Sequence, residues 1–176
     1  MKKLLEVIGI ILVSLLVVVG AVVLGARWFF GPLGPIPGPE LSGPVVEEPV
    51  DDWSWIDAVK VVQIETRPED PYSVSTWVTR VGNEIHVFAG DEDSPWVENI
   101  GDDPRVRVRI RGRIYQLAAV RVADLEKKRV FLTAMKSKYQ NDFGFDPEFF
   151  QRGWDSGEFV LLRMEPRQGA RRLSPP

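Results

Sequence analysis

Twenty consecutive residues near the N-terminus, Val7 to Ala26, carry no charged side chain, and this run constrains the fold more than any other feature of the chain. At a rise of about 1.5 Å per residue, a helix of this length spans roughly 30 Å, the thickness of the hydrocarbon core of a bilayer. Inside lipid, a lone segment can satisfy its backbone N–H and C=O groups only as a helix. The sequence therefore predicts a transmembrane anchor over residues 1–30, in contact with the lipid bilayer through residues 7–26.

A cleaved signal peptide is the alternative interpretation of this run. Secretory apolar segments are usually about 7–15 residues long and end in an Ala-x-Ala-like site. Cleavage after Ala26 would place Leu24 where a small residue is required. A retained anchor is therefore favoured, and the aromatic residues that follow it, Trp28 to Phe30, are typical of a membrane interface.

The basic residues on the two sides of the run predict the orientation of the anchor. Lys2 and Lys3 precede it, whereas Arg27 is the only basic residue between the run and Lys60. The positive-inside rule thus favours a single-pass protein of the cell membrane, with a cytoplasmic N-terminus and an extracytoplasmic domain.

Residues 31–50 form the next segment and contain six prolines. Proline removes backbone donors and disfavours helix, so this segment is expected to be extended. It is predicted to be a spacer that holds the following domain away from the bilayer. The alternative is a strap that lies along the domain surface through Leu33, Ile36 and Leu41.

Residues 51–165 are predicted to form one domain, followed by a flexible tail over residues 166–176. Alternation of apolar and polar side chains predicts six strands, at residues 59–66, 73–81, 84–89, 105–111, 113–122 and 158–165. Gly82-Asn83 and Gly112 are expected to turn the chain between neighbouring strands. Helices are expected to begin near Ser94, Asp124 and Asp146, where capping residues precede proline or a helical pattern.

The composition excludes several classes of function. The chain has no cysteine and only one histidine, which excludes disulfides, thiol catalysis and metal sites built from cysteines or several histidines. Beyond the anchor, acidic side chains outnumber basic ones, so nucleic acid is not an expected partner. A metal ion is not expected either, because cysteine and a second histidine are lacking. The single histidine, His86, is interpreted as a surface residue of a strand, with a haem ligand as the alternative.

Five arginines alternate with apolar residues from Arg105 to Arg113. Guanidinium groups suit phosphate and carboxylate, so this row could hold an anionic cofactor, a lipid head group or an acidic partner. The interpretation that we favour is an outward strand face whose arginines pair with acidic residues of neighbouring strands.

Several segments resemble the FMN-binding split β-barrel superfamily, which includes pyridoxamine-phosphate-oxidase-like and deazaflavin-dependent nitroreductase-like proteins. The resemblance covers about residues 59–140 and is carried by Ile64 to Arg67, Ser73 to Trp77, His86 to Phe88, Ser94 to Ile100 and Asp103 to Val108. It implies a mainly β (α+β) fold, a six-stranded antiparallel split β-barrel with two or three flanking helices, preceded here by one transmembrane helix. It also implies a homodimer and an FMN, F420 or haem cofactor.

One loop departs from the pattern of the family. The nitroreductase-like members carry a Gly-Arg-x-Ser-Gly loop that holds the phosphate of the cofactor, whereas Arg67 to Tyr72 contain two prolines and two carboxylates. Missing N–H donors and added negative charge both disfavour a phosphate. The resemblance thus implies a flavin- or deazaflavin-binding oxidoreductase-like domain with a degenerate phosphate loop.

The residues that this resemblance assigns to binding of FMN or F420 are Arg67, Ser73, Ser75, Trp96 and Asn99. No catalytic residue is identified. The alternative function is a non-catalytic envelope scaffold that uses the barrel to bind another protein.

Overall fold

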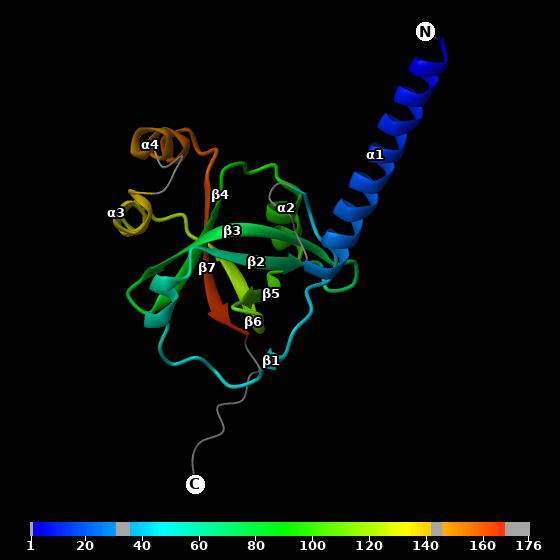
Figure 1. The fold of residues 1–176 in the computed structure, drawn as a ribbon. Coiled ribbons are helices and arrows are strands. Elements are labelled where there is room, and N and C mark those ends of the chain that lie inside the picture. The colour runs from blue at the N-terminus through cyan, green and yellow to red at the C-terminus, as the bar shows by residue number, and fades with distance from the viewer. Residues whose placement is uncertain (1, 31–35, 142–145, 168–176) are drawn as a thin grey trace.

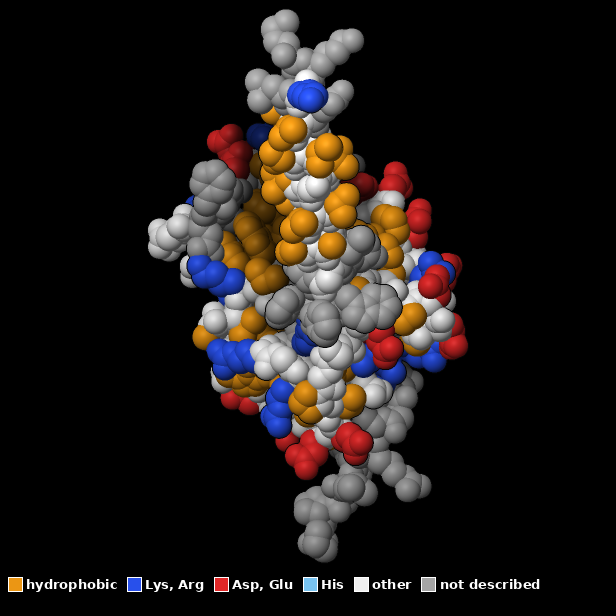
Figure 2. All heavy atoms as spheres, turned by 45° about the vertical axis from the view of Figure 1, so that its right-hand side comes forward, with side chains coloured by type: hydrophobic (Ala, Val, Ile, Leu, Met, Phe, Trp, Pro, Cys, Tyr) orange, Lys and Arg blue, Asp and Glu red, His pale blue; other side chains and the backbone are white. Residues whose placement is uncertain are grey.

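The computed structural model describes residues 2–30, 36–141 and 146–167 (Figure 1). Its first element is the helix α1 (Lys2–Phe30), whose large apolar side chains between Val7 and Val22 are exposed (Figure 2). Among the described residues, no helix reaches the length and mean hydropathy of a membrane span. The side chains of Trp28 to Phe30, and residues 168–176 of the predicted tail, lie outside the described part of the chain.

Six antiparallel strands form a closed barrel. They are β2 (Val61–Thr66), β3 (Tyr72–Val81), β4 (Glu84–Ala89), β5 (Arg105–Ile110), β6 (Arg113–Arg121) and β7 (Val160–Pro166). Neighbours follow the order β6-β5-β2-β3-β4-β7, and pairing of β6 with β7 closes the ring. The predicted six-stranded antiparallel barrel is therefore confirmed.

Side-chain alternation places the core inside this barrel. In β5, Val106, Val108 and Ile110 are at most 1% exposed, and the intervening arginines point outward. Gly82 (φ 61°) and Gly112 (φ 79°) turn the β3–β4 and β5–β6 hairpins, since glycine adopts this left-handed conformation without a Cβ clash.

Three helices flank the barrel, namely α2 (Pro95–Asp102), α3 (Leu125–Tyr139) and α4 (Pro147–Ser156), and a short 3₁₀ helix, η1 (Ser54–Ala58), precedes β2. Asp124 and Asp146 cap α3 and α4 by accepting bonds from backbone N–H groups. Ser94 precedes α2 as predicted, but its hydroxyl donates to the carbonyl of Asp91 and caps no N–H group.

Helices α3 and α4 lie side by side on one side of the barrel (Figure 1). A second core, separate from that of the barrel interior, lies between these helices and the sheet. Its members are Phe131, Met135, Tyr139, Phe150, Trp154, Phe159 and Leu161.

Residues 38–46, which we call the strap, lie on the barrel surface. Gly38 pairs with Ser73 of β3, and β1 (Val45–Val46) pairs in parallel with β6. Between these two ends Leu41 is buried, at 1% exposed. Of the two interpretations of the proline-rich segment, the strap thus describes these residues, whereas Leu33 lies outside the described part of the chain.

Candidate functional site

A groove opens where β3 and β4 separate. The two strands are in register only from Val78 to Val81 of β3; before that, the hydroxyl of Thr76 donates to the carbonyl of Phe88 at 3.1 Å. Helices α2 and α4 cover part of this gap. The resulting groove, which we call the aromatic groove, has a volume of about 350 Å³. It is lined by Val74, Ser75, Thr76, Trp77, Phe88, Ala89, Gly90, Trp96, Phe149, Phe150 and Phe159.

Its walls are apolar and are held by ring contacts. Trp77 stacks on Tyr139 with ring centroids 4.7 Å apart and an interplanar angle of 8°, and Phe88 meets Phe150 edge to face at 5.3 Å. Phe149 lies at the rim, with half of its surface exposed. Among the described lining residues none is charged, so the groove suits a planar, uncharged ring.

The hydroxyl of Tyr139 fixes the wall from behind. It donates toward the carbonyls of Lys60 and Val78, each at 2.7 Å, and accepts from the Val78 N–H at 3.2 Å. Trp77 is therefore stacked on a ring that is itself held by backbone groups. This arrangement limits rotation of the indole that lines the groove.

Of the five predicted cofactor residues, the structure brings two together in the groove. Ser75 and Trp96 both line it. Asn99, one turn further along α2, instead donates to the hydroxyl oxygen of Thr66 at 3.1 Å.

The other two predicted residues lie in the loop between β2 and β3 and at the start of β3, and both already bond to other groups of the protein. The hydroxyl of Ser73 is fully buried and donates to the carbonyl of Pro39 at 2.7 Å. Arg67 adopts a left-handed backbone (φ 55°), and its guanidinium pairs with the carboxylate of Asp70. A phosphate therefore does not fit these residues, because the hydroxyl has an acceptor and the positive charge has a counter-ion. The described lining of the aromatic groove, by contrast, contains no charged side chain.

The favoured interpretation of the arginine row, pairing with acidic residues of neighbouring strands, holds for Arg107, whereas Arg105 pairs with the residue just before its own strand and Arg111 lies over the ring of Trp55. Arg105 contacts Asp103 at 2.6 Å, and Arg107 contacts Glu65 of neighbouring β2 at 2.9 Å. Arg109 donates to Gln63, and burial lowers the pKa of its guanidinium.

His86 is buried, at 5% exposed, so the prediction of a surface histidine is wrong. The reason is that α3 covers the outer face of β4: the imidazole lies 6.1 Å from the ring of Phe131, and its Nδ1 lies 3.3 Å from the carbonyl of Glu84. Burial lowers the pKa of His86. Within the described residues, no group of His, Asp and Glu side chains is arranged to hold a metal ion.

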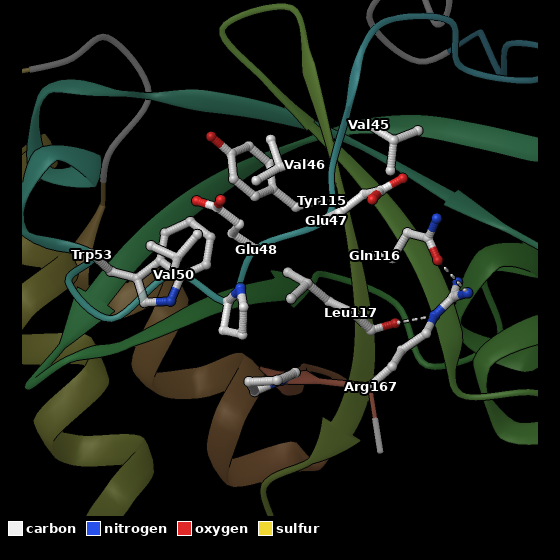
Figure 3. A pocket seen from close by; sticks show the side chains of 12 residues that line it. Val45, Val46, Glu47, Glu48, Val50, Trp53, Tyr115, Gln116, Leu117 and Arg167 are labelled. Carbon is white, nitrogen blue, oxygen red and sulfur yellow. Dashed lines mark hydrogen bonds between the residues drawn. The ribbon is translucent and has the colours of Figure 1, made fainter. Parts of the chain in front are cut away.

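A second pocket, of about 420 Å³, lies where β1 and β7 diverge along β6 (Figure 3). Glu48 and Trp53 lie at one end, and Gln116 and Arg167 at the other. Arg167 donates to the carbonyl of Leu117 at 3.2 Å, so its charge is directed to the barrel itself. Sequence reasoning missed this pocket, because a two-residue strand leaves no periodic signal.

Comparisons with known proteins agree with this fold. The sequence pattern of the family described as F420H(2)-dependent quinone reductase matches residues 71–143, a range that includes Ser75 and Trp96. No curated protein sequence is significantly similar to the chain.

Three of the solved structures that share the architecture illustrate the likeness. Rv2991 of Mycobacterium tuberculosis is 16% identical, with a TM-score of 0.51 over 78% of this chain and 94% of that one. The heme storage protein HutZ of Vibrio cholerae is 15% identical, with a TM-score of 0.50 over 65% and 87%. ChuZ of Campylobacter jejuni is 11% identical, with a TM-score of 0.51 over 64% and 50%. At these identities the likeness concerns the fold alone.

Proposed function

We propose, from the family pattern that matches residues 71–143 and from the barrel fold, that this chain belongs to the split β-barrel superfamily of flavin-binding proteins and that its aromatic groove binds the planar ring of a flavin or deazaflavin. The observation that carries the proposal is the groove itself, a slot of about 350 Å³ whose described lining is largely aromatic, carries no charge and includes Ser75 and Trp96. Stacking on an aromatic wall stabilises a planar ring and does not require a phosphate. The protein is then a deazaflavin-dependent reductase-like domain whose phosphate loop is degenerate.

The ring-binding proposal is tested with lumiflavin, an isoalloxazine without a phosphate chain, added to the full chain in detergent micelles. Contact with Trp96 and neighbouring rings should quench its fluorescence. Phe149→Ser removes an aromatic ring from the rim and should weaken binding about three- to tenfold, the size of one aromatic contact. Leu125→Ser alters an apolar side chain on α3 that is 67% exposed and does not line the groove, so it should leave the affinity unchanged.

No quenching of lumiflavin by a chain that is folded by circular dichroism would contradict ring binding. The non-catalytic envelope scaffold would then be the better account of the barrel.

We also propose that residues 7–26 of α1 cross the cell membrane once, with the N-terminus in the cytoplasm. The support is the absence of charge over this run and the exposure of its large apolar side chains, which are at least 44% exposed from Val7 to Val22. A reporter that is active only outside the cytoplasm, fused to the C-terminus, should be active. Activity from a cytoplasmic reporter alone, or release of the chain from membranes by alkaline carbonate, would contradict this topology.

A further inference from the structure

The strap crosses the outer face of the barrel beside the aromatic groove. It begins at the edge of β3, where Gly38 and Ser73 exchange backbone hydrogen bonds of 2.8 and 3.0 Å. It ends beside β6, where the N–H of Ile114 donates to the carbonyl of Pro44 at 2.9 Å. Ser73 is two residues from Ser75 of the groove, so the strap starts at the edge of the candidate ring site.

Beneath the strap, three side chains form a row across neighbouring strands. Ser73 of β3 is in register with Glu65 of β2, and Glu65 is in register with Arg107 of β5. Side chains at paired positions share a face of the sheet, and adjacent strands lie about 4.8 Å apart. The row is thus continuous from the groove edge to Arg107.

Arg107 lies between two carboxylates. One of its terminal nitrogens, Nη1, contacts Glu65 at 2.9 Å and Glu40 of the strap at 2.8 Å, and the other, Nη2, donates to the carbonyl of Leu41 at 2.8 Å. Glu65 is 2% exposed, whereas the side chain of Glu40 is 68% exposed. Glu65 is therefore the permanent partner, and Glu40 approaches the same guanidinium from the solvent side.

The donors of this row are directed at the oxygens of the strap. The Ser73 hydroxyl donates to the carbonyl of Pro39, and Arg107 donates to Glu40 and Leu41. A hydroxyl and a guanidinium on one face are the donor set that suits an oxyanion such as phosphate. In this protein, the carboxylate of Glu40 and the carbonyls of Pro39 and Leu41 accept these bonds in place of an oxyanion.

We propose that Ser73 and Arg107 form an oxyanion site beside the aromatic groove and that Glu40 of the strap is its built-in occupant. An occupied oxyanion site narrows the ligand of the aromatic groove to a ring without a phosphate group. This part of the proposal rests on the proposed function. Phosphorylated cofactors are then excluded, because Glu40 and the buried Glu65 both repel a phosphate and both pair with Arg107.

The occupied site is tested with inorganic pyrophosphate, which needs no ring site. Thermal unfolding of the full chain in detergent micelles should not respond to pyrophosphate. Glu40→Gln removes the charge of an exposed side chain and keeps its shape, so pyrophosphate should now raise Tm. The matched control is Glu84→Gln. Glu84 is a half-exposed glutamate outside the strap that pairs with Arg163 at 3.1 Å, so this variant should show no response to pyrophosphate.

Riboflavin and FMN, which differ by one phosphate, test the ligand class. The unaltered chain should bind them equally within about threefold, and Glu40→Gln should favour FMN by at least about tenfold, the size of one charge-assisted hydrogen bond. Two results would contradict the proposal that Glu40 occupies the site: stabilisation of the unaltered chain by pyrophosphate, or the same response to pyrophosphate in Glu40→Gln and Glu84→Gln. If no flavin binds, the proposal that the groove binds a ring fails. The pyrophosphate measurement still tests whether Glu40 occupies the oxyanion site.

Discussion

Replacing Leu41 by alanine tests whether the strap is part of the folded unit. Leu41 is 1% exposed, and Glu65 and Arg107 bond its N–H and C=O groups. The substitution removes roughly three apolar carbons, or about 2.4 kcal/mol at about 0.8 kcal/mol per CH₂. Core Leu→Ala changes cost about 2–5 kcal/mol once the cavity is included, and a strap at the surface can relax, so we expect about 2–3 kcal/mol.

The free energy of unfolding is measured by urea titration of the full chain in detergent micelles, followed by near-ultraviolet circular dichroism. For a domain of this size, about 1 kcal/mol corresponds to roughly 4 °C, so Tm should fall by about 8–12 °C. Leu125→Ala, at a side chain that is 67% exposed, is the control and should change stability by less than about 0.5 kcal/mol. Equal effects of the two substitutions would refute the reasoning and would mean that the segment acts as a free linker.

Three further predictions follow from buried groups. Arg107→Met leaves the Glu65 carboxylate, which is 2% exposed, without its cation, and we expect a loss of about 3–5 kcal/mol in urea titrations. Burial lowers the pKa of His86, so below about pH 6.5 the unfolded chain binds more protons than the folded chain, and stability at pH 5 should be lower than at pH 7.5 by an amount that His86→Gln reduces. Gly153→Ala places a Cβ 2.6 Å from the buried ring of Phe159 and should cost about 1–3 kcal/mol in thermal unfolding.

Each of these has a control. Adding Glu65→Gln to Arg107→Met removes the stranded charge and should recover part of the loss; no recovery would assign the loss to packing. An unchanged pH dependence in His86→Gln would mean that other groups cause it. Gly101→Ala, in α2, meets no atom within 4 Å and should be neutral or stabilise by up to about 1 kcal/mol, so equal losses at the two glycines would contradict a steric cause at Gly153.

Local patterns in the sequence determined most of the barrel. Alternation from Arg105 to Ile110 indicated both the strand and its buried face, because successive side chains of a strand point to opposite sides. The hairpin turns at Gly82 and Gly112 followed from the backbone freedom of glycine. The strand starts were less accurate: β2 begins at Val61 because Val59 is held by η1, its N–H donating to the carbonyl of Ile56.

The candidate site was predictable only in part. Ser75 and Trp96 lie in the groove, but the groove also needs α4, whose Phe149 and Phe150 are more than fifty residues further along the chain. Ser73 has the residue type of a ligand, yet its hydroxyl is taken by the strap. Which donors are free depends on contacts between distant segments, and the spacing of residues along a chain does not report them.

The sequence by itself determined where the chain is extended, where it is helical and which strand faces are apolar, since these depend on neighbours a few residues away. Only the tertiary structure decided that the proline-rich segment becomes a strap and that His86 is covered by α3. Leu41 is one apolar residue without periodicity, and its burial depends on Glu65 and Arg107, brought beneath it by closure of the sheet. Such long-range contacts form when the barrel folds, and that is why they leave no local pattern to read.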